Sequence, residues 1–295
     1  MVRSSGGRGS IGVRSTPARH GKLLCRARHC AGSDVSQDQQ APFLTALEQA
    51  RAAAYPAGEY VGQESFMRAG EVRTLAHQAR ISPGVSVLDL CCGVAGPGRM
   101  IMAESGCLYL GVDHSASALA AARELAADLP CRFEQAHLPP LPHGRFEVVL
   151  LLETMLAFPD KEALVSEVAQ VLEPGGRFAF TVEEGRPLTQ QEQERMPAAD
   201  TVWLIELAEL TDVLRGAGLT VIWQQEYTCS HQAIATALNR CYLAESSQIA
   251  QEIGMQATTE LITAHRLWSN WLGSGRVRKF AMVAEKQCLS SMKPR

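Results

Sequence analysis

Short apolar runs alternate along most of this chain with stretches in which apolar residues recur every three or four positions. The short runs have the length of buried strands, and we place them at 85–88, 107–113, 131–133, 146–153, 177–182, 219–227 and 276–284. The stretches between them have helical spacing, as at Leu164, Val168 and Val171. Strands that alternate with helices predict an α/β fold, with a doubly wound, mostly parallel sheet covered by helices on both faces.

Two segments depart from this alternation. Residues 41–84 precede the first strand and show helical spacing on either side of a turn-rich stretch at 55–63. Between the sixth strand and the last one, residues 229–273 place their apolar positions at helical spacing. A helical insertion at this point predicts a lid or a pocket wall beside the sheet.

The beginning of the chain has a different composition. Its first 33 residues are rich in Arg, Gly and Ser and contain no Asp or Glu. Such a segment buries too little apolar surface to fold, so we expect residues 1–40 to form a disordered arm. An organelle transit peptide has a similar composition, although the glycines oppose the amphipathic helix that import needs. The predicted domain spans 41–286, and a short tail over 287–295 follows it.

Composition limits the classes of protein that remain. The 295 residues suffice for one large α/β core, and a net charge of -3 argues against a nucleic-acid partner. No apolar run approaches the ~18 residues of a membrane span. The nine cysteines form no CxxC pair and no cluster with zinc spacing. We therefore expect a soluble monomer or homodimer without a metal, in the reducing cytoplasm, or in an organelle if the arm is a transit peptide.

Polar residues stand at the ends of four predicted strands. Asp89 begins a turn of small residues over 89–98 that leads into a helix, an arrangement that faces backbone N–H groups toward a ligand. Asp113 ends the second strand, Gln135 follows the third, and Glu153 ends the fourth. Ligands of open parallel sheets bind beyond the carboxyl ends of the strands. The pattern predicts a nucleoside there, with Asp113 on the ribose hydroxyls.

These segments resemble the class I S-adenosylmethionine-dependent methyltransferases over about 60–286. Residues 87–96 are similar to the glycine-rich first motif of that family, with Cys91 and Ala95 in place of two glycines. Residues 111–113 resemble its ribose-binding segment, and residues 172–177 resemble its Leu-Lys-Pro-Gly-Gly stretch. The resemblance implies a Rossmann-like sheet of seven strands, the last one antiparallel, with the helical lid inserted before it.

The resemblance also implies S-adenosyl-L-methionine as the methyl donor and a set of residues that hold it. These residues are Asp89, Cys91, Gly93, Ala95, Gly96, Asp113, His114, Gln135, Ala136 and Leu152. Only glycine adopts a left-handed backbone at little cost. The implied donor site therefore depends most on the backbone that Cys91 and Ala95 adopt in place of glycines. A Rossmann dehydrogenase is the rival reading, but it has Gly-x-Gly-x-x-Gly directly after the strand, a spacing that is absent here.

Local features narrow the branch of the family. Residues 96–99, 146–155 and 159–161 resemble the tocopherol, sterol and prenyl C-methyltransferases. Small-molecule N-methyltransferases share the same scaffold, so carbon, nitrogen and oxygen all stay open as the methylated atom. The apolar face of the lid favours a small, partly hydrophobic acceptor, such as one of secondary metabolism. A methyltransferase-like protein that binds the donor without catalysis is the alternative, opposed by the retained Asp89, Asp113 and Glu153.

Methyl transfer is an in-line displacement that depends mostly on alignment of donor and acceptor. A carboxylate near the acceptor can stabilise positive charge or take a proton, and Glu153 is our candidate for it. His231 is the candidate base for a nitrogen or oxygen acceptor. The candidate residues of the acceptor pocket and lid are Tyr60, Gln63, His265, Trp268 and Trp271. For His265, a structural role in the core is the simpler interpretation.

Overall fold

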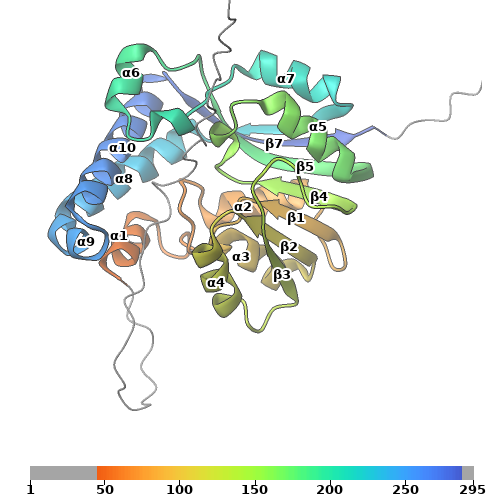
Figure 1. Cartoon of the computed structure of the whole chain (residues 1–295), viewed down its shortest axis with the longest axis horizontal. Helices are drawn as coiled ribbons and strands as arrows, with labels where there is room; N and C mark the ends of the chain where they lie inside the picture. The colour runs from red at the N-terminus through yellow and green to blue at the C-terminus, as the bar shows by residue number, and fades with distance from the viewer. Residues whose placement is uncertain (1–44, 288–295) are drawn as a thin grey trace, which may run out of the picture.

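One sheet of seven strands, in the order β3-β2-β1-β4-β5-β7-β6, forms the centre of the computed structural model, which describes residues 45–287 (Figure 1). The strands are β1 Ser86–Leu90, β2 Leu108–Asp113, β3 Cys131–Gln135, β4 Phe146–Leu151, β5 Leu172–Glu184, β6 Leu219–Glu226 and β7 Arg278–Lys286. The five strands from β1 to β5 pair in parallel, whereas β7 is antiparallel to both β5 and β6. The predicted fold class, with its antiparallel last strand, is confirmed.

Helices cover both faces of the sheet. The elements before β6 are α1 Ala46–Ala54, α2 Ala69–Gln78, α3 Gly96–Ser105, α4 Ala116–Leu125, the 3-10 helix η1 Met155–Ala157, α5 Lys161–Val171, α6 Gln190–Arg195, the 3-10 helix η2 Ala199–Thr201 and α7 Leu207–Gly216. Apolar side chains of α5 and α7 pack on one face, and those of α2, α3 and α4 pack on the other. The doubly wound arrangement follows from these two separate layers of core.

Strand β4 shows why its sequence is apolar without interruption. Val148 and Leu150 join the core that α2, α3 and α4 cover, whereas Val149 and Leu151 join the core under α5 and α7. Successive side chains of a strand point to opposite faces, so a central strand needs apolar residues at every position. The strand ends at Leu151, two residues earlier than the sequence pattern predicts.

The insertion before β7 is helical, as predicted. It consists of α8 Thr228–Ala244, α9 Ser246–Ile253 and α10 Met255–Ser274. Helix α1 packs against this group, because Ala50 and Tyr55 share a buried cluster with Leu238 and Tyr242 of α8. The four helices lie together at the left of Figure 1, to one side of the sheet. We call α8, α9 and α10 the insertion helices.

Some predictions fall outside the described residues or differ in detail. The arm at 1–40, the first residues of the 41–84 helical segment and most of the 287–295 tail lie outside residues 45–287. Strand β5 begins earlier than predicted and includes Pro174-Gly175-Gly176, with a register shift opposite Phe146 and Val148 of β4. Helix α6 was not predicted; a capping box between Thr189 and Glu192 starts it.

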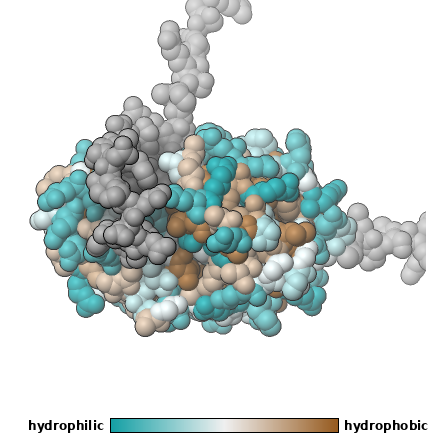
Figure 2. Space-filling view, turned by 90° about the horizontal axis from the view of Figure 1, so that it is seen from below, coloured by the Kyte–Doolittle hydropathy of each residue, from teal (hydrophilic) through white to brown (hydrophobic). Residues whose placement is uncertain are grey.

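The surface of the described part mixes polar and apolar residues. The large apolar side chains that are exposed are Leu108, Leu125, Trp203, Ile222, Leu243 and Met255, which belong to different elements. On the face in Figure 2, hydrophobic residues gather near the middle and hydrophilic residues surround them. Within residues 45–287, no helix has the length and hydropathy to cross a membrane.

Candidate functional site

The loop from β1 to α3 adopts an unusual backbone. Cys91, Gly93 and Ala95 have φ values of 56, 56 and 55 degrees, which lie in the left-handed region. Hydrogen bonds fix the loop, from the N–H of Cys92 to the carbonyl of Val112 at 3.0 Å and from the N–H of Ala95 to the carbonyl of Cys92 at 2.8 Å. The two residues in place of glycines therefore adopt the backbone that glycines favour.

Because Ala95 has a left-handed backbone, substitution by Gly should change the free energy of unfolding less there than at Ala122 of α4. Both alanines are buried in the same core cluster. Ala95→Gly removes about 1–2 kcal/mol of left-handed strain, which offsets the lost methyl burial and the added freedom of the unfolded chain. We expect its free energy of unfolding to stay within about 0.5 kcal/mol of the parent's. Ala122→Gly has no strain to relieve and should cost about 2 kcal/mol. Urea titrations with equal losses for both variants would contradict this reading.

Glycines near the start of α3 allow a close approach of other segments. A Cβ atom at Gly96 would lie 2.5 Å from the carbonyl oxygen of Val61, and one at Gly98 would overlap the Tyr109 hydroxyl. At Gly93, by contrast, a Cβ atom would meet no atom within 4 Å. Other segments therefore pack closely against the loop at Gly96 and Gly98, whereas the side of the loop at Gly93 is open.

Asp89 lies beneath this loop rather than at the strand ends. Its carboxylate is buried and accepts a hydrogen bond of 2.5 Å from the Tyr109 hydroxyl. Burial raises the pKa of Asp89 to about 7, the Tyr109 hydrogen bond opposes this shift, and the charge of Asp113 adds to it. Asp89 thus supports the loop from inside the core.

The raised pKa of Asp89 makes stability depend on pH. The unfolded carboxyl ionises near 3.8 and the folded one near 7, so the folded state holds the extra proton between these values. The free energy of unfolding attributable to Asp89 therefore falls as pH rises from 3.8 to 7, by an amount on the order of 4 kcal/mol.

Asp89→Asn keeps a neutral partner for Tyr109 and removes this titration. Relative to the parent, the variant should gain stability as pH rises from 5 to 8, and urea titrations across that range measure the difference. A difference that does not change with pH would contradict the assignment.

Asp113 occupies the end of β2 with both carboxylate oxygens engaged. Its Oδ2 accepts from the N–H of Gly93 at 2.9 Å, and its Oδ1 accepts from the N–H of Ser115 at 2.8 Å. Nδ1 of the exposed His114 ring also lies 3.2 Å from Oδ1. A carboxylate offers about four acceptor sites, so a lone pair of Oδ2 remains for a ligand hydroxyl, and a movement of the His114 ring would free a second site on Oδ1. The first of these bonds ties the open loop to the end of the neighbouring strand.

Residues at the end of β3 are hydrogen-bonded to the backbone around Asp113. Gln135 donates its side-chain amide to the carbonyl of His114 at 2.9 Å, and the N–H of Ala136 donates to the carbonyl of Asp113 at 3.0 Å. The His114 side chain is 42% exposed, and Leu152 is partly buried in the core below. The structure thus brings Gly93, Asp113, His114, Gln135 and Ala136 together, with Asp89 set apart in the core.

Glu153 lies two residues beyond β4 and has a left-handed backbone, with φ of 60 degrees. Its N–H donates to the Thr181 hydroxyl at 2.6 Å, and its carboxylate lies 2.8 Å from the Lys279 ammonium. Lys279 also pairs with Glu183 of β5. Burial raises the pKa of Glu153, but Lys279 and His231 outweigh burial and lower it below its ordinary value. Glu153 is therefore held as an anion.

His231 and the insertion helices form the other wall of this region. The Nε2 atom of His231 lies 3.1 Å from Glu71 of α2, and its Nδ1 atom lies 3.8 Å from Glu153. Phe66 makes edge contacts with the rings of His231, His265 and Trp268, at centroid distances of 6.3, 5.8 and 6.5 Å. Phe66 also donates its N–H to Glu153 Oε2 at 3.3 Å, so this aromatic group lies next to Glu153.

The other lid candidates have structural partners. Gln63 is buried and ties its own loop, donating to the carbonyls of Glu59 and Met67. His265 shares a hydrogen bond of 2.8 Å with the carbonyl of Leu261, and burial lowers its pKa to about 4. Tyr60 and Trp271 contact other aromatic rings, Tyr55 and Trp268, at 5.4 and 5.3 Å.

Sequence reasoning missed part of this site. The missed residues are Phe66, Glu71, Thr181, Glu183 and Lys279. Lys279 carried a usable signal, because it is a charged residue at the start of an apolar strand. Within residues 45–287, no group of three His, Cys, Asp or Glu side chains is arranged to hold a metal ion.

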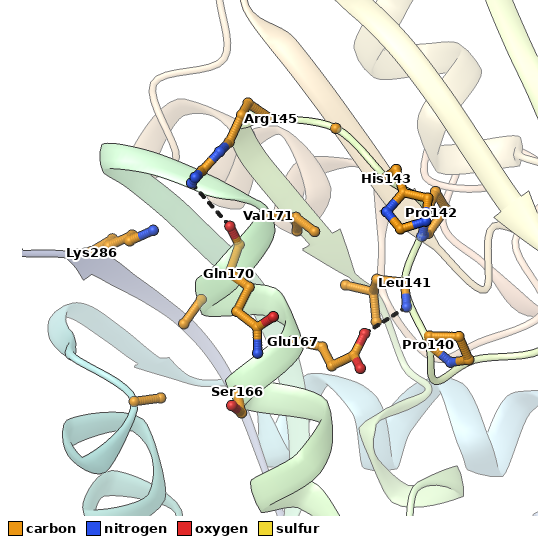
Figure 3. A pocket seen from close by; sticks show the side chains of 13 residues that line it. Pro140, Leu141, Pro142, His143, Arg145, Ser166, Glu167, Gln170, Val171 and Lys286 are labelled. Atoms are coloured by element: carbon orange, nitrogen blue, oxygen red, sulfur yellow. Dashed lines mark hydrogen bonds between the residues drawn. The ribbon is translucent and has the colours of Figure 1, made fainter.

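A groove of about 730 Å³ lies away from this site (Figure 3). It is lined by the segment before β4 and the end of α5, at the amino ends of the parallel strands. Arg145 donates to the carbonyl of Gln170 at 3.0 Å, Lys286 donates to the carbonyl of Leu172, and Glu167 accepts from the N–H of Leu141. Its charged groups therefore stabilise the loop and the helix end.

Comparison with known proteins agrees with this geometry. Residues 88–180 match the methyltransferase domain family. The chain is 32% identical to a methyltransferase of Synechocystis sp., over 50% of this chain and 72% of that protein. It is 35% identical to sterol 24-C-methyltransferase ERG6B of Gibberella zeae, over 39% of this chain and 32% of that protein. The chain spans between 29% and 49% of the length of the sterol methyltransferases it matches.

Solved structures show the same fold. The cyclopropane synthase MmaA2 from Mycobacterium tuberculosis superimposes with a TM-score of 0.68 at 11% identity, covering 79% of this chain and 90% of that one. Its likeness concerns the fold, whereas the sequence matches extend to the family. With the family match, the strand order and the ends of β1 to β4 in agreement, the chain belongs to the class I S-adenosylmethionine-dependent methyltransferase family.

Proposed function

We propose that this protein transfers a methyl group from S-adenosylmethionine to a small, partly hydrophobic organic acceptor. The observation that carries the proposal is the meeting of polar residues at the ends of the parallel strands. Asp113 at the end of β2 holds the open loop after β1, and Glu153 follows β4, the strand on the other side of β1. The open space above Gly93, next to the Asp113 carboxylate, supports a donor at this place.

The residues present fit the donor by their chemistry. The loop over 91–96 would face its amino-acid part, and Asp113 would accept the two ribose hydroxyls. His114, Gln135 and Ala136 would border the adenine, with Leu152 as an apolar floor. When bound, the donor supplies an electrophilic methyl group on a sulfonium.

The aromatic side chains near Glu153 support a partly hydrophobic acceptor. Phe66 packs with Trp268 of α10 in one apolar cluster, and its N–H donates to Glu153 at 3.3 Å. The sterol methyltransferases matched by the chain are named for an apolar acceptor. We propose an acceptor of the kind that secondary metabolism uses, and we infer a lid role for the insertion helices.

Glu153 would act as a fixed anion toward the acceptor. The Lys279 ammonium holds it ionised, so it serves better to stabilise positive charge on the acceptor than to take a proton. His231 would then be the proton acceptor, with its Nδ1 atom on the Glu153 side.

A screen with trideuteromethyl-labelled S-adenosylmethionine and a panel of candidate acceptors, read by mass spectrometry, tests the proposal. We expect a labelled product from apolar or amphipathic acceptors. Labelling of highly charged small amines alone would contradict the acceptor class. No product with any acceptor, together with donor binding, would favour a non-catalytic donor-binding protein.

Glu153→Gln removes the anion and keeps the size of the side chain. We expect the turnover of the labelled acceptor to fall by about 100-fold to 1000-fold, as for loss of one electrostatic stabiliser. Binding of S-adenosylhomocysteine should persist, because Asp113 and the loop are untouched. Unchanged turnover would end the catalytic candidacy of Glu153.

The state of the cysteines supports a proposal for the cellular compartment of the protein. Those in the described part are all free thiols, with Cys91 and Cys92 adjacent in the donor loop. Free thiols support our proposal of a reducing compartment such as the cytoplasm.

A further inference from the structure

Glu71 and His231 form a buried pair from segments far apart in the chain. Glu71 lies in the first turn of α2, and His231 lies in the first turn of α8. Their side chains are 3% and 1% exposed, and Glu71 Oε2 lies 3.1 Å from His231 Nε2. A carboxylate only accepts hydrogen bonds, so this contact places a proton on Nε2.

The other nitrogen of the imidazole has no hydrogen-bond partner. His231 Nδ1 is buried and lies 3.8 Å from the carboxylate of Glu153. An unsatisfied polar atom thus lies beside the carboxylate at which we place the acceptor. Buried polar atoms without partners call for a ligand, a water or a catalytic role.

Other contacts hold both side chains of the pair in place. Glu71 accepts a hydrogen bond of 2.5 Å from the Ser230 hydroxyl and pairs with Arg68 at 3.0 Å. Burial raises the pKa of Glu71, but its hydrogen bonds with His231, Ser230 and Arg68 outweigh burial and lower it to about 2. The His231 ring stacks on Tyr227, with an interplanar angle of 9 degrees, and Phe66 meets its edge. The imidazole therefore has one orientation and an ionised partner.

We propose that Glu71 is a positioning residue, which keeps the His231 proton on Nε2 and leaves the lone pair of Nδ1 to take the proton that the acceptor loses. This inference rests on the proposed function. It adds to the site a residue 160 positions away from His231, on a helix that bears none of the donor-binding residues.

The proton balance of the step is as follows. An electron pair of the acceptor forms the new bond to the methyl carbon, while the carbon–sulfur bond of the donor breaks and leaves its pair on sulfur. The methylated acceptor then loses a proton to Nδ1 and keeps the electrons of that bond. The resulting imidazolium lies between Glu71 and Glu153, which stabilise it until it releases a proton to solvent.

The charged and titratable groups that face the imidazole define its environment. Glu71 comes from α2 and Glu153 from the segment after β4, while the Tyr227 ring precedes α8. Lys279 of β7 pairs with the opposite oxygen of the Glu153 carboxylate, so Glu153 lies between its ammonium group and the imidazole. A change at Glu71 therefore acts directly on Nε2.

Nuclear magnetic resonance of the full-length protein labelled with ¹⁵N in histidine tests the inference. Two-bond ¹H–¹⁵N spectra report which nitrogen of a neutral imidazole carries the proton, and a His231→Gln variant assigns the signals. We expect the His231 proton on Nε2 in the parent and a mixture of both tautomers in Glu71→Gln. With an acceptor from the labelling screen, kcat of this variant should fall by about 10-fold to 100-fold at unchanged KM.

Glu59→Gln is the matched control. Glu59 accepts a hydrogen bond from the N–H of Gly70, at the same end of α2 as Glu71. Its substitution by Gln removes the same charge as Glu71→Gln, but at a side chain that does not contact His231. We expect parent-like tautomer and kcat in this control.

A parent protein with the proton on Nδ1, or a Glu71→Gln variant with unchanged tautomer and kcat, would overturn the inference. If the parent protein does not bind S-adenosylhomocysteine at all, this result would contradict the proposed function instead. The two failures are therefore distinguishable.

Discussion

A Lys279→Met variant is expected to lose about 3–5 kcal/mol of unfolding free energy, a large share of the 5–15 kcal/mol typical of a folded domain. The Lys279 ammonium lies between the buried carboxylates of Glu153 and Glu183. Its removal leaves two neighbouring anions without their cation, away from water. Urea titration at neutral pH measures the loss.

Two further variants isolate the cause. Lys286→Met removes another β7 lysine, one that donates to the carbonyl of Leu172, and should cost about 1 kcal/mol. Adding Glu183→Gln to Lys279→Met should recover part of the loss, because one anion then remains in place of two. A Lys279→Met variant as stable as Lys286→Met would refute the buried charge cluster.

An Asp113→Ala variant is expected to bind S-adenosylhomocysteine about 100-fold or more weakly. The variant lacks the carboxylate that we propose as acceptor for the ribose hydroxyls of the ligand, and each hydrogen bond to a charged acceptor is worth about 1.5–3 kcal/mol. It would also release the N–H of Gly93 and with it the open loop. Calorimetric titration gives the dissociation constant.

The control for this variant is Asp160→Ala. Asp160 caps α5 through the N–H of Ala163 at 2.8 Å and has no contact with the donor loop. It should lower stability by about 1 kcal/mol and leave the affinity unchanged. Equal affinities of Asp113→Ala and the parent would remove Asp113 from the donor site.

The sequence predicted the sheet well, and with it the meeting of the strand ends, because both depend on local patterns. The apolar run of β4, the small residues over 91–98 and the acid at the end of β2 each occupy the place in the fold that their neighbours in sequence indicate. Parallel topology then brings the strand ends together without further information.

Asp89 shows how a local pattern can still mislead. It ends the apolar run, but it alternates with Leu88 and Leu90, which face the α5 side, so its side chain points to the opposite face beside Tyr109. The pleat of the strand, and not its closeness to the turn, decides where the carboxylate lies.

The acceptor side was only partly predictable because its contacts are long-range. Glu71 and His231 are 160 residues apart, and Glu183 and Lys279 are 96 residues apart. Glu153 and His231 were identified singly, but the charge of Glu153 and the orientation of the His231 ring depend on partners that no sequence spacing reveals. Gln63 illustrates the opposite case, because a polar residue near the site serves to tie its own loop.

Calorimetric titration of the full-length protein with S-adenosylmethionine and S-adenosylhomocysteine tests the central claim most directly. The claim is that the ends of β1 to β4 hold this donor. We predict saturable binding of one molecule of either ligand per chain, and no binding of a nicotinamide dinucleotide. The absence of heat from both sulfur nucleosides would contradict the account.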